Sequence, residues 1–194
     1  MWPEMRMDER QAIEHLQRGD IRGLEALVRL HQVRAIRTAY LVTRELPLAQ
    51  DIVQAAFLRA CERIGQLDPH RPFGPWFLTS VLHDAIKAAA RRGRFESLER
   101  VLEGQASLAP ALVVDGQPGP EAVWEHAETA DEVWAALARL TPEQRAAVVA
   151  RYFLGLSEAE MTTALACPSS TVKRRLHAAR QRLRLLLTPL FTNE

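Results

Sequence analysis

The chain has 194 residues, of which 47% are hydrophobic and 25% are charged, with 25 Lys and Arg against 24 Asp and Glu. This length fits one ordinary domain or two small ones, and the apolar fraction excludes a globally disordered chain. No apolar run approaches the roughly 18 residues that a membrane span needs, and the N-terminus lacks the basic and apolar regions of a signal peptide. We therefore expect a cytoplasmic protein with no membrane segment of its own.

Cysteine and histidine usage indicates neither a metal site nor an enzyme. The two cysteines form no CxxC motif, the six histidines are dispersed, and the chain contains no HExxH, Walker or GxSxG motif. Cys61 lies near an apolar helix face and is expected in the core. Cys167 precedes a basic segment. We expect a structural role for this cysteine, with a redox role as the less favoured alternative. We expect no cofactor, no metal and no catalytic residue.

The net charge of +1 conceals a strongly uneven distribution. Residues 1–92 carry a net charge of +3, residues 93–133 a net charge of −7, and residues 134–194 a net charge of +5. Positions 161 to 193 contain six cationic side chains and no acidic one. Since a merely solvated surface usually mixes both signs, this layout indicates local anionic partners.

Helical periodicity predicts an all-α chain whose first part is a four-helix bundle over residues 1–92. The first helix is expected from Asp8 to about Gln17, and Asp20 is a good N-cap for a second helix that runs to about Arg44. A third helix begins near Pro47. A fourth helix follows the loop 66–72 and is expected to end at Arg91 and Arg92.

Residues 93–119 have weak periodicity, several acids and the glycines and prolines of a linker. Helical spacing returns over 120–194. Thr141 and Ser157 are expected to cap two further helices, the second in a capping box with Glu160. A turn at Cys167 and Pro168 then leads into a final helix that runs to about Leu187.

The order of short helix, turn and basic helix is that of a helix-turn-helix, whose second helix lies in the DNA major groove. At about 100° per residue, one narrow arc of the final helix is apolar and must pack inward. The opposite arc carries polar and cationic residues: Ser170, Thr171, Lys173, Arg174, His177, Arg180, Gln181 and Arg184. Residues near the start of such a helix reach base edges, whereas Arg180 and Arg184 are expected to reach phosphate.

Four segments, two in each half of the chain, resemble the extracytoplasmic-function (ECF) group of bacterial RNA polymerase sigma factors. LTPEQRAAVVARYFLGLSEAEM at 140–161 and PSSTVKRRLHAAR at 168–180 resemble sigma region 4. DIVQAAFLRA at 51–60 and RPFGPWFL at 71–78 resemble sigma region 2. The resemblance implies two small helical domains, region 2 over 1–92 and region 4 over 120–194, joined by the acidic linker 93–119.

This resemblance implies a protein that binds core RNA polymerase and directs it to promoter DNA. Region 4 would read the minus-thirty-five element. In region 2, the polymerase contacts would be Asp51, Gln54 and Leu58. The minus-ten contacts would be Arg71, His83, Lys87 and Arg91. Trp76 could stack on an extruded base, although its place on the apolar stripe favours core packing. The family also implies an anti-sigma factor as a candidate partner.

Several positions depart from the family pattern, namely Ala55, Thr79, His83, Ser170 and Ala178. These departures leave two alternatives open beside the sigma factor. An autonomous helix-turn-helix regulator would explain the basic helix but not the polymerase-binding motif. A sigma-mimicking interaction protein would sequester a regulator without touching promoters. The promoter sequence, the inducing signal and the regulon cannot be predicted from the chain.

Overall fold

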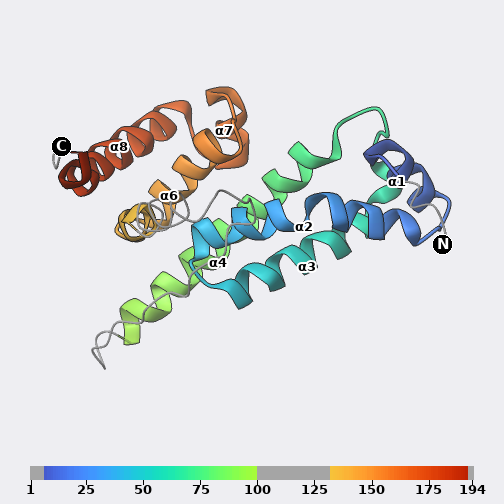
Figure 1. Cartoon of the computed structure of the whole chain (residues 1–194), viewed down its shortest axis with the longest axis horizontal. Coiled ribbons are helices and arrows are strands. Elements are labelled where there is room, and N and C mark those ends of the chain that lie inside the picture. The colour runs from blue at the N-terminus through green and yellow to red at the C-terminus, as the bar shows by residue number, and fades with distance from the viewer. Residues whose placement is uncertain (1–6, 100–131, 192–194) are drawn as a thin grey trace, which may run out of the picture.

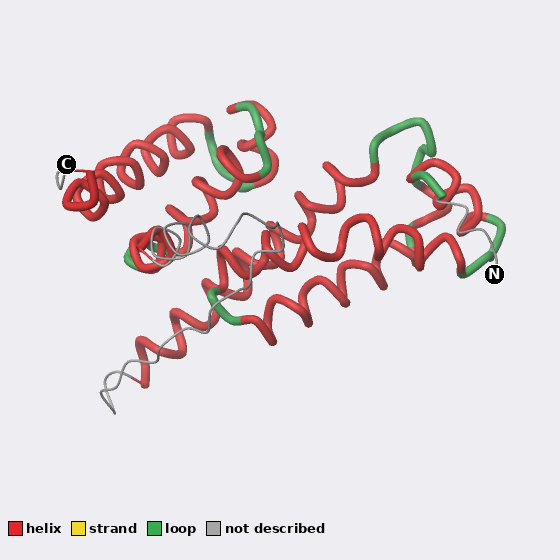
Figure 2. Tube along the Cα trace, viewed as in Figure 1, coloured by secondary structure: helices red, strands yellow, loops and turns green. Residues whose placement is uncertain are grey.

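The structure is a computed structural model that describes residues 7–99 and 132–191, with side chains described over 7–92 and 132–187. Every described element is helical, which confirms the all-α prediction (Figures 1 and 2). In the first part lie α1 (Glu9–Gln17), α2 (Arg22–Thr43), α3 (Leu46–Glu62), the 3-10 turn η1 (Ile64–Gln66) and α4 (Phe73–Glu99). After a helix over 132–138 come α6 (Pro142–Val148), the π-helical turn η2 (Val149–Phe153), α7 (Glu158–Ala164) and α8 (Ser169–Phe191).

Short polar side chains start the helices at the expected places. Asp8, Thr141 and Ser157 each accept a hydrogen bond from the backbone N–H three residues on, and each belongs to a complete capping box. A side-chain acceptor at this position satisfies a donor that the helix itself leaves unpaired. These three helix starts could therefore be predicted from local chemistry alone. The expected N-cap of α2 at Asp20 is wrong, because the N-cap is Ile21 and makes no side-chain hydrogen bond, while the Asp20 carboxylate accepts from the Arg22 N–H only two residues on.

The first part is a bundle with α2 at its centre, in contact with α1, α3 and α4. Its core contains aliphatic and aromatic side chains from all four helices, including Ile13, Leu27, Val53, Phe57 and Phe77. The short helix α1 lies at one end of the bundle, beside the connection from α3 to α4 (Figure 1). This position matters for the site described below.

Two features differ from the sequence-based expectation. The helix α4 continues to Glu99, beyond the expected end at Arg92, while residues 100–131, which hold most of the predicted linker, lie outside the described residues. The helix that begins at Pro142 changes to π geometry, so that the N–H of Leu154 donates to the carbonyl of Val149. Periodicity does not reveal this widening, because it inserts a single residue into an otherwise regular helix.

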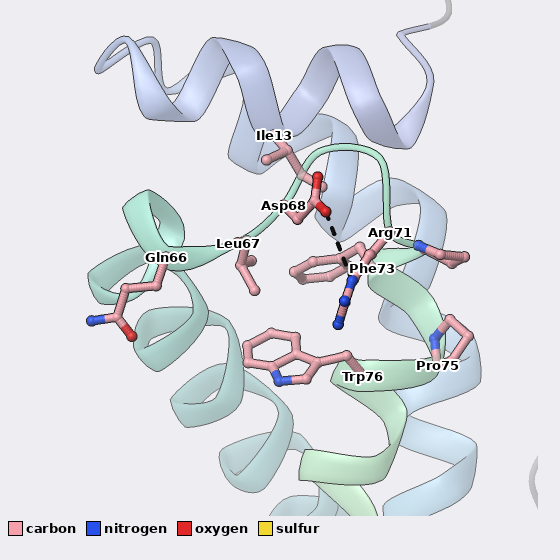
Figure 3. A pocket seen from close by; sticks show the side chains of 9 residues that line it. Ile13, Gln66, Leu67, Asp68, Arg71, Phe73, Pro75 and Trp76 are labelled. Carbon is pink, nitrogen blue, oxygen red and sulfur yellow. Dashed lines mark ion pairs between the residues drawn. The ribbon is translucent and has the colours of Figure 1, made fainter.

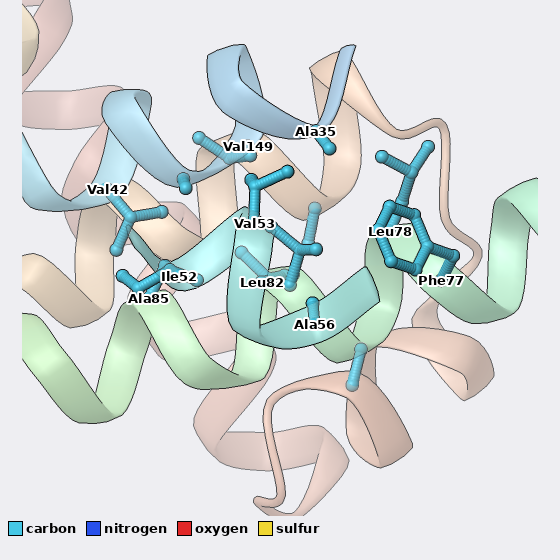
Figure 4. Close-up of a cluster of buried hydrophobic side chains, with 14 of the residues drawn as sticks. Ala35, Val42, Ile52, Val53, Ala56, Phe77, Leu78, Leu82, Ala85 and Val149 are labelled. Carbon is cyan, nitrogen blue, oxygen red and sulfur yellow. The ribbon is translucent and has the colours of Figure 1, made fainter. Parts of the chain in front are cut away.

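The two parts of the chain share a hydrophobic core. Helix α6 contacts α2 and α4, η2 contacts α2, and α7 contacts α4. Val149 of η2 belongs to the same buried cluster as Ala35 and Val42 of α2 (Figure 4). Next to this contact, the ring of Tyr40 meets the ring of Trp134 edge-on at 5.4 Å between centroids.

Arg145 provides a polar link across this contact. Its side chain is 7% exposed; Nε donates to the carbonyl of Val42 at 3.1 Å, and Nη1 donates to the carbonyl of Leu140 at 2.9 Å. Burial lowers the pKa of Arg145 to about 10. The guanidinium thus binds carbonyls at the C-terminal end of α2 and just after the helix over 132–138. Carbonyls at such ends have no partner within their own helix.

Within the described ranges, none of the helices has the length and apolar character that a membrane crossing requires.

Candidate nucleic-acid interface

Helices α7 and α8 form a helix-turn-helix. The turn between them includes Ala166, whose φ of 47° lies in the left-handed region. The cap at Ser157 fixes the start of α7, where Ser157 Oγ and N–H both donate to the Glu160 carboxylate. These hydrogen bonds lower the pKa of Glu160, because they stabilise its charged form. The capped α7 provides a packing surface for α8 (Figure 1).

The structure places the two arcs of α8 as the sequence predicts. Val172, Leu176 and Ala179 are buried against the preceding helices. Thr171 is half-buried, and the remaining predicted DNA-binding residues are exposed: Ser170, Lys173, Arg174, His177, Arg180, Gln181 and Arg184. One face of the helix therefore packs inward while the opposite face presents cations and hydrogen-bonding groups.

Lys173 and Arg175 of α8 each lie close to another side chain of the protein. Lys173 Nζ lies 3.4 Å from a Glu158 carboxylate oxygen on α7, in an exposed pair. Arg175, which the sequence analysis leaves out of the DNA-binding set, is half-buried, and its Nη1 lies 3.5 Å from Cys167 Sγ. The Cys167 side chain thus packs against the N-terminal part of α8. The other cysteine, Cys61, is half-buried, and burial raises the pKa of its thiol.

A pocket of about 590 Å³ lies where the α3–α4 loop meets α1 and α4 (Figure 3). This volume falls within the range of about 300–1,000 Å³ typical of small-ligand sites. Its lining is mainly apolar and aromatic: Ile13, Leu67, Pro72, Phe73, Pro75 and Trp76. The polar lining residues are Gln66, Asp68 and Arg71. Asp68 and Arg71 form an exposed ion pair with 3.7 Å between Arg71 Nε and Asp68 Oδ2.

The expectation that Trp76 favours core packing is wrong. The Trp76 side chain is 38% exposed and lines the pocket, with its ring centroid 5.7 Å from that of Phe73. The core position on this stripe belongs to the next residue, Phe77, which is fully buried. Consecutive apolar residues of a helix point about 100° apart, so both cannot face the core centre equally.

The predicted minus-ten residues lie at the pocket and along α4. Arg71 lines the pocket, with its side chain 86% exposed. On α4, His83 is half-buried, and Lys87 and Arg91 are exposed. Their spacing of four residues, and of seven from Trp76, places them in a row on one helix face. The departure at Thr79 has a local role, because its hydroxyl donates to the Pro75 carbonyl at 2.8 Å.

The predicted polymerase contacts form an exposed surface on α3. Asp51 and Gln54 are exposed, and Leu58 is 58% exposed despite its apolar side chain. Their spacing places all three on the face opposite to Val53, Ala56 and Phe57, which are buried. This surface lies on a different helix from the row along α4.

Ile13 of α1 lines the pocket and is not among the predicted site residues. Leu67 and Asp68 line it too, and they lie in the same loop as the predicted contact Arg71. An apolar residue on a short N-terminal helix looks like an ordinary core residue, so only the three-dimensional contact reveals this role. The loop itself could be singled out from its prolines and charges.

Comparisons with known proteins match both parts of the chain. Residues 27–95 match the family model "Sigma-70 region 2", and residues 130–183 match "Sigma-70, region 4". The "ECF RNA polymerase sigma factor SigL" of Mycobacterium tuberculosis is 32% identical over 170 residues, covering 86% of this chain and 90% of the relative. The "RNA polymerase sigma-H factor" of Pseudomonas aeruginosa is 27% identical over 188 residues, covering 94% and 95%.

Two solved structures share the fold. One is the "sigma factor RpoE in complex with the anti-sigma factor NepR from Bartonella quintana", with a TM-score of 0.62, 19% identity, and coverage of 88% of this chain and 98% of that one. The other is "CnrH in complex with the cytosolic domain of CnrY", with a TM-score of 0.56, 23% identity, and coverage of 94% and 99%.

Fold and sequence define a two-part helical protein of the sigma-70 class. More closely, the chain belongs to the ECF RNA polymerase sigma factors. Its function is that of an RNA polymerase sigma factor, which directs core polymerase to promoters. Membership in this family favours the sigma factor over the alternative of an autonomous helix-turn-helix regulator.

Proposed function

We propose that each of three described surfaces has a separate role in promoter recognition. The exposed arc of α8 reads the minus-thirty-five duplex, the pocket and the row along α4 capture the minus-ten strand, and the exposed face of α3 docks on core polymerase. The domain boundaries at 92 and 119 are part of this proposal. The protein acts in the cytoplasm and catalyses no bond chemistry of its own.

The observation that carries the proposal is the pocket beside α4. A melted strand is held by a cationic groove together with aromatic surfaces on which unstacked bases lie. Trp76 supplies the aromatic surface, and the buried Phe73 ring packs beside it. Arg71 supplies a cation at the rim, and Lys87 and Arg91 continue the cationic row. An extruded base would enter between the loop and α4, as other proteins accommodate flipped bases in closely fitting pockets.

The α8 surface supports duplex reading for a different reason. Its cationic side chains neutralise phosphates, while Ser170, Lys173 and Arg174 near the helix start can reach base edges. The partial positive charge of the helix N-terminus favours the same anionic partner. Arg180 and Arg184 stand further along the helix, where contacts to phosphate dominate.

An anti-sigma factor is the proposed inhibitor. The two similar solved structures are of proteins bound to such partners or to a cytosolic protein domain. A partner that covers the face of α3 with Asp51, Gln54 and Leu58 would block polymerase docking without touching the DNA-binding residues.

Reconstituted transcription tests the proposal as a whole. Core polymerase is combined with the full chain on a genomic fragment library, and the transcription start sites are mapped. We expect new start sites that share two upstream elements and depend on the chain. Binding to core polymerase without any new start site would favour the sigma-mimicking alternative. No affinity for core polymerase would contradict the assignment of α3.

A further inference from the structure

The helix α1 contacts both ends of the loop that forms the pocket. Residues 9–17 precede the segment 27–95 that matches sigma region 2, so the family match does not include this helix. Ile13 of α1 is nevertheless one of the apolar residues that line the pocket (Figure 3). The pocket is therefore incomplete without α1.

At the start of the loop, the contact is made by Gln17. Its side-chain Nε2 donates to the carbonyl of Ile64 at 3.0 Å and to the carbonyl of Leu67 at 2.9 Å. A single amide nitrogen has two hydrogens, and here each one has its own acceptor. Leu67 lines the pocket, so this pair of hydrogen bonds fixes one pocket wall relative to α1.

At the end of the loop, the contact is made by Glu9. Its Oε2 accepts a hydrogen bond from the N–H of Phe73 at 2.9 Å, at the first residue of α4. A carboxylate at a helix N-terminus satisfies an otherwise unpaired donor and interacts favourably with the helix dipole. Phe73 also lines the pocket, so the second wall is likewise fixed from α1.

The surroundings of Glu9 leave it little freedom. Its Oε1 lies 2.9 Å from Nε2 of the buried His31, which is an ion-pair distance. The His31 ring contacts Phe73 and Phe77, with centroids 5.4 and 6.4 Å apart. At Gly74, an added Cβ would lie only 3.0 Å from the His31 ring and 3.4 Å from Glu9 Oε1. The Glu9 carboxylate is thus held by packing from several sides.

We propose that α1 sets the width of the base pocket, with Glu9 and Gln17 as positioning residues for base discrimination. This inference rests on the proposed role of the pocket in capturing the minus-ten strand. Neither side chain has to touch DNA. Each holds one end of the loop, so that the walls of the pocket are in place before the base arrives, which reduces the ordering that binding requires.

The experiment compares variants of the full chain in complex with core polymerase. Wild-type complex first selects fluorescein-labelled single-stranded 12-mers from a random pool, with core polymerase alone as the background. Affinities are then measured for the selected 12-mer and for versions with one base changed. The variants are Gln17→Met, which keeps the side-chain length but removes both donors, Glu9→Ala, and Glu9→Gln, which keeps an acceptor for the Phe73 N–H.

Glu14→Ala is the matched control. Glu14 lies on the same helix and has the same charge as Glu9, but its carboxylate pairs with Arg10 of α1 and with Arg18, the residue after α1, and not with the loop. Binding of each variant to random duplex DNA, which depends on α8, is measured in parallel. Thermal unfolding of each variant is recorded to compare their stabilities.

We expect Gln17→Met and Glu9→Ala to lower the discrimination between matched and mismatched 12-mers by about 5- to 20-fold, as a less ordered pocket would. Glu9→Gln should restore most of it, while Glu14→Ala and all duplex affinities should stay at the wild-type values. Unchanged discrimination in Gln17→Met would overturn the role of α1. A wild-type complex that selects no 12-mer beyond the core polymerase background would instead overturn the proposed function of the pocket.

Discussion

Arg174 and Arg180 lie on the same exposed arc of α8, but at different distances from its N-terminus. In the proposed function, the side chain near the helix start reaches base edges and the later one reaches phosphates. Both are exposed arginines, so exchanging either for alanine removes the same charge and leaves the buried face intact. They therefore form a natural pair for separating base reading from phosphate binding.

Arg174→Ala should change sequence preference. A good base contact discriminates by about 1–3 kcal/mol, so preference at one base pair should fall by roughly 5- to 150-fold. Arg180→Ala should weaken all duplexes alike and lower the slope of log affinity against log salt by about 1. Fluorescence anisotropy with a panel of single-substituted minus-thirty-five duplexes at several salt concentrations measures both effects. Equal weakening of every duplex by Arg174→Ala would disprove its role in base reading.

In the pocket, Trp76 is the residue whose substitution tests base binding. Stacking of a base on an aromatic ring contributes about 1–3 kcal/mol, so Trp76→Ala should lower single-strand affinity by roughly 5- to 150-fold. Trp76→Phe should retain much of the affinity, because a smaller aromatic face remains. The measurement is the affinity of the polymerase complex for a single-stranded minus-ten oligonucleotide. The assignment would be wrong if Trp76→Ala bound the strand as wild type does while polymerase docking stayed intact.

At the scale of the element, the short helix α7 depends on its N-terminal cap. The helix has only seven residues, so its own hydrogen bonds stabilise it weakly, and the capping box of Ser157 and Glu160 compensates for this. The cap also orients the surface on which α8 packs. Loss of the Ser157 cap should therefore also disturb the packing of α8.

The capping box gives the domain a defined pH dependence. The pKa of Glu160 is lower in the folded chain than in the unfolded chain, since Ser157 stabilises the carboxylate. The unfolded state therefore binds more protons in this range, so the contribution is complete above the ordinary glutamate pKa of about 4.3 and is lost as the pH falls through the folded value. Ser157→Ala removes the hydroxyl hydrogen bond but keeps the backbone one, so it should weaken this dependence. Loss of the cap should also lower the free energy of unfolding by about 0.5–2 kcal/mol.

Urea unfolding between pH 3 and pH 7 measures this effect, with helix content as the signal. Ser169→Ala, which changes an exposed serine outside this capping box, is the control. A Ser157→Ala protein whose stability falls with acid as steeply as that of wild type would show that the capping box does not cause the dependence.

Some features of the helices can be predicted from the sequence, and others cannot. Caps such as Asp8, Thr141 and Ser157 act through hydrogen bonds three residues away, so local sequence is sufficient to place them. The arcs of α8 follow from helical periodicity for the same reason. The π-helical turn after Val148 and the role of Ile13 in the pocket depend on packing between distant segments, which no local pattern records.

At the scale of the whole molecule, the role of Arg145 could not be predicted from the sequence. Arg145 lies within the segment that resembles region 4, where an arginine reads as one more surface cation. In the structure it is buried and bridges carbonyls from both parts of the chain. Only the packing of α6 against α2 gives it this role.

Arg145→Met should loosen the contact between the two parts. The substitution leaves buried carbonyls without a donor, which lowers the free energy of unfolding by about 1–3 kcal/mol. The radius of gyration from small-angle X-ray scattering should rise above that of the wild-type protein. Arg139→Met, a change at an exposed arginine nearby, is the matched control. An Arg145→Met protein with unchanged stability and radius would contradict the bridging role.

The core shared by α2, α4, α6 and η2 restricts how far the protein can reach. Elements centred at positions −10 and −35 are separated by about 25 base pairs, or about 85 Å along B-form DNA at 3.4 Å per step. The longest described helix, α4, has 27 residues and is about 40 Å long, less than half of that separation. We therefore expect the packed arrangement to hold one promoter element at a time. Gripping both at once requires the two halves to separate, so the stability of their contact sets an energetic threshold for productive assembly on a promoter.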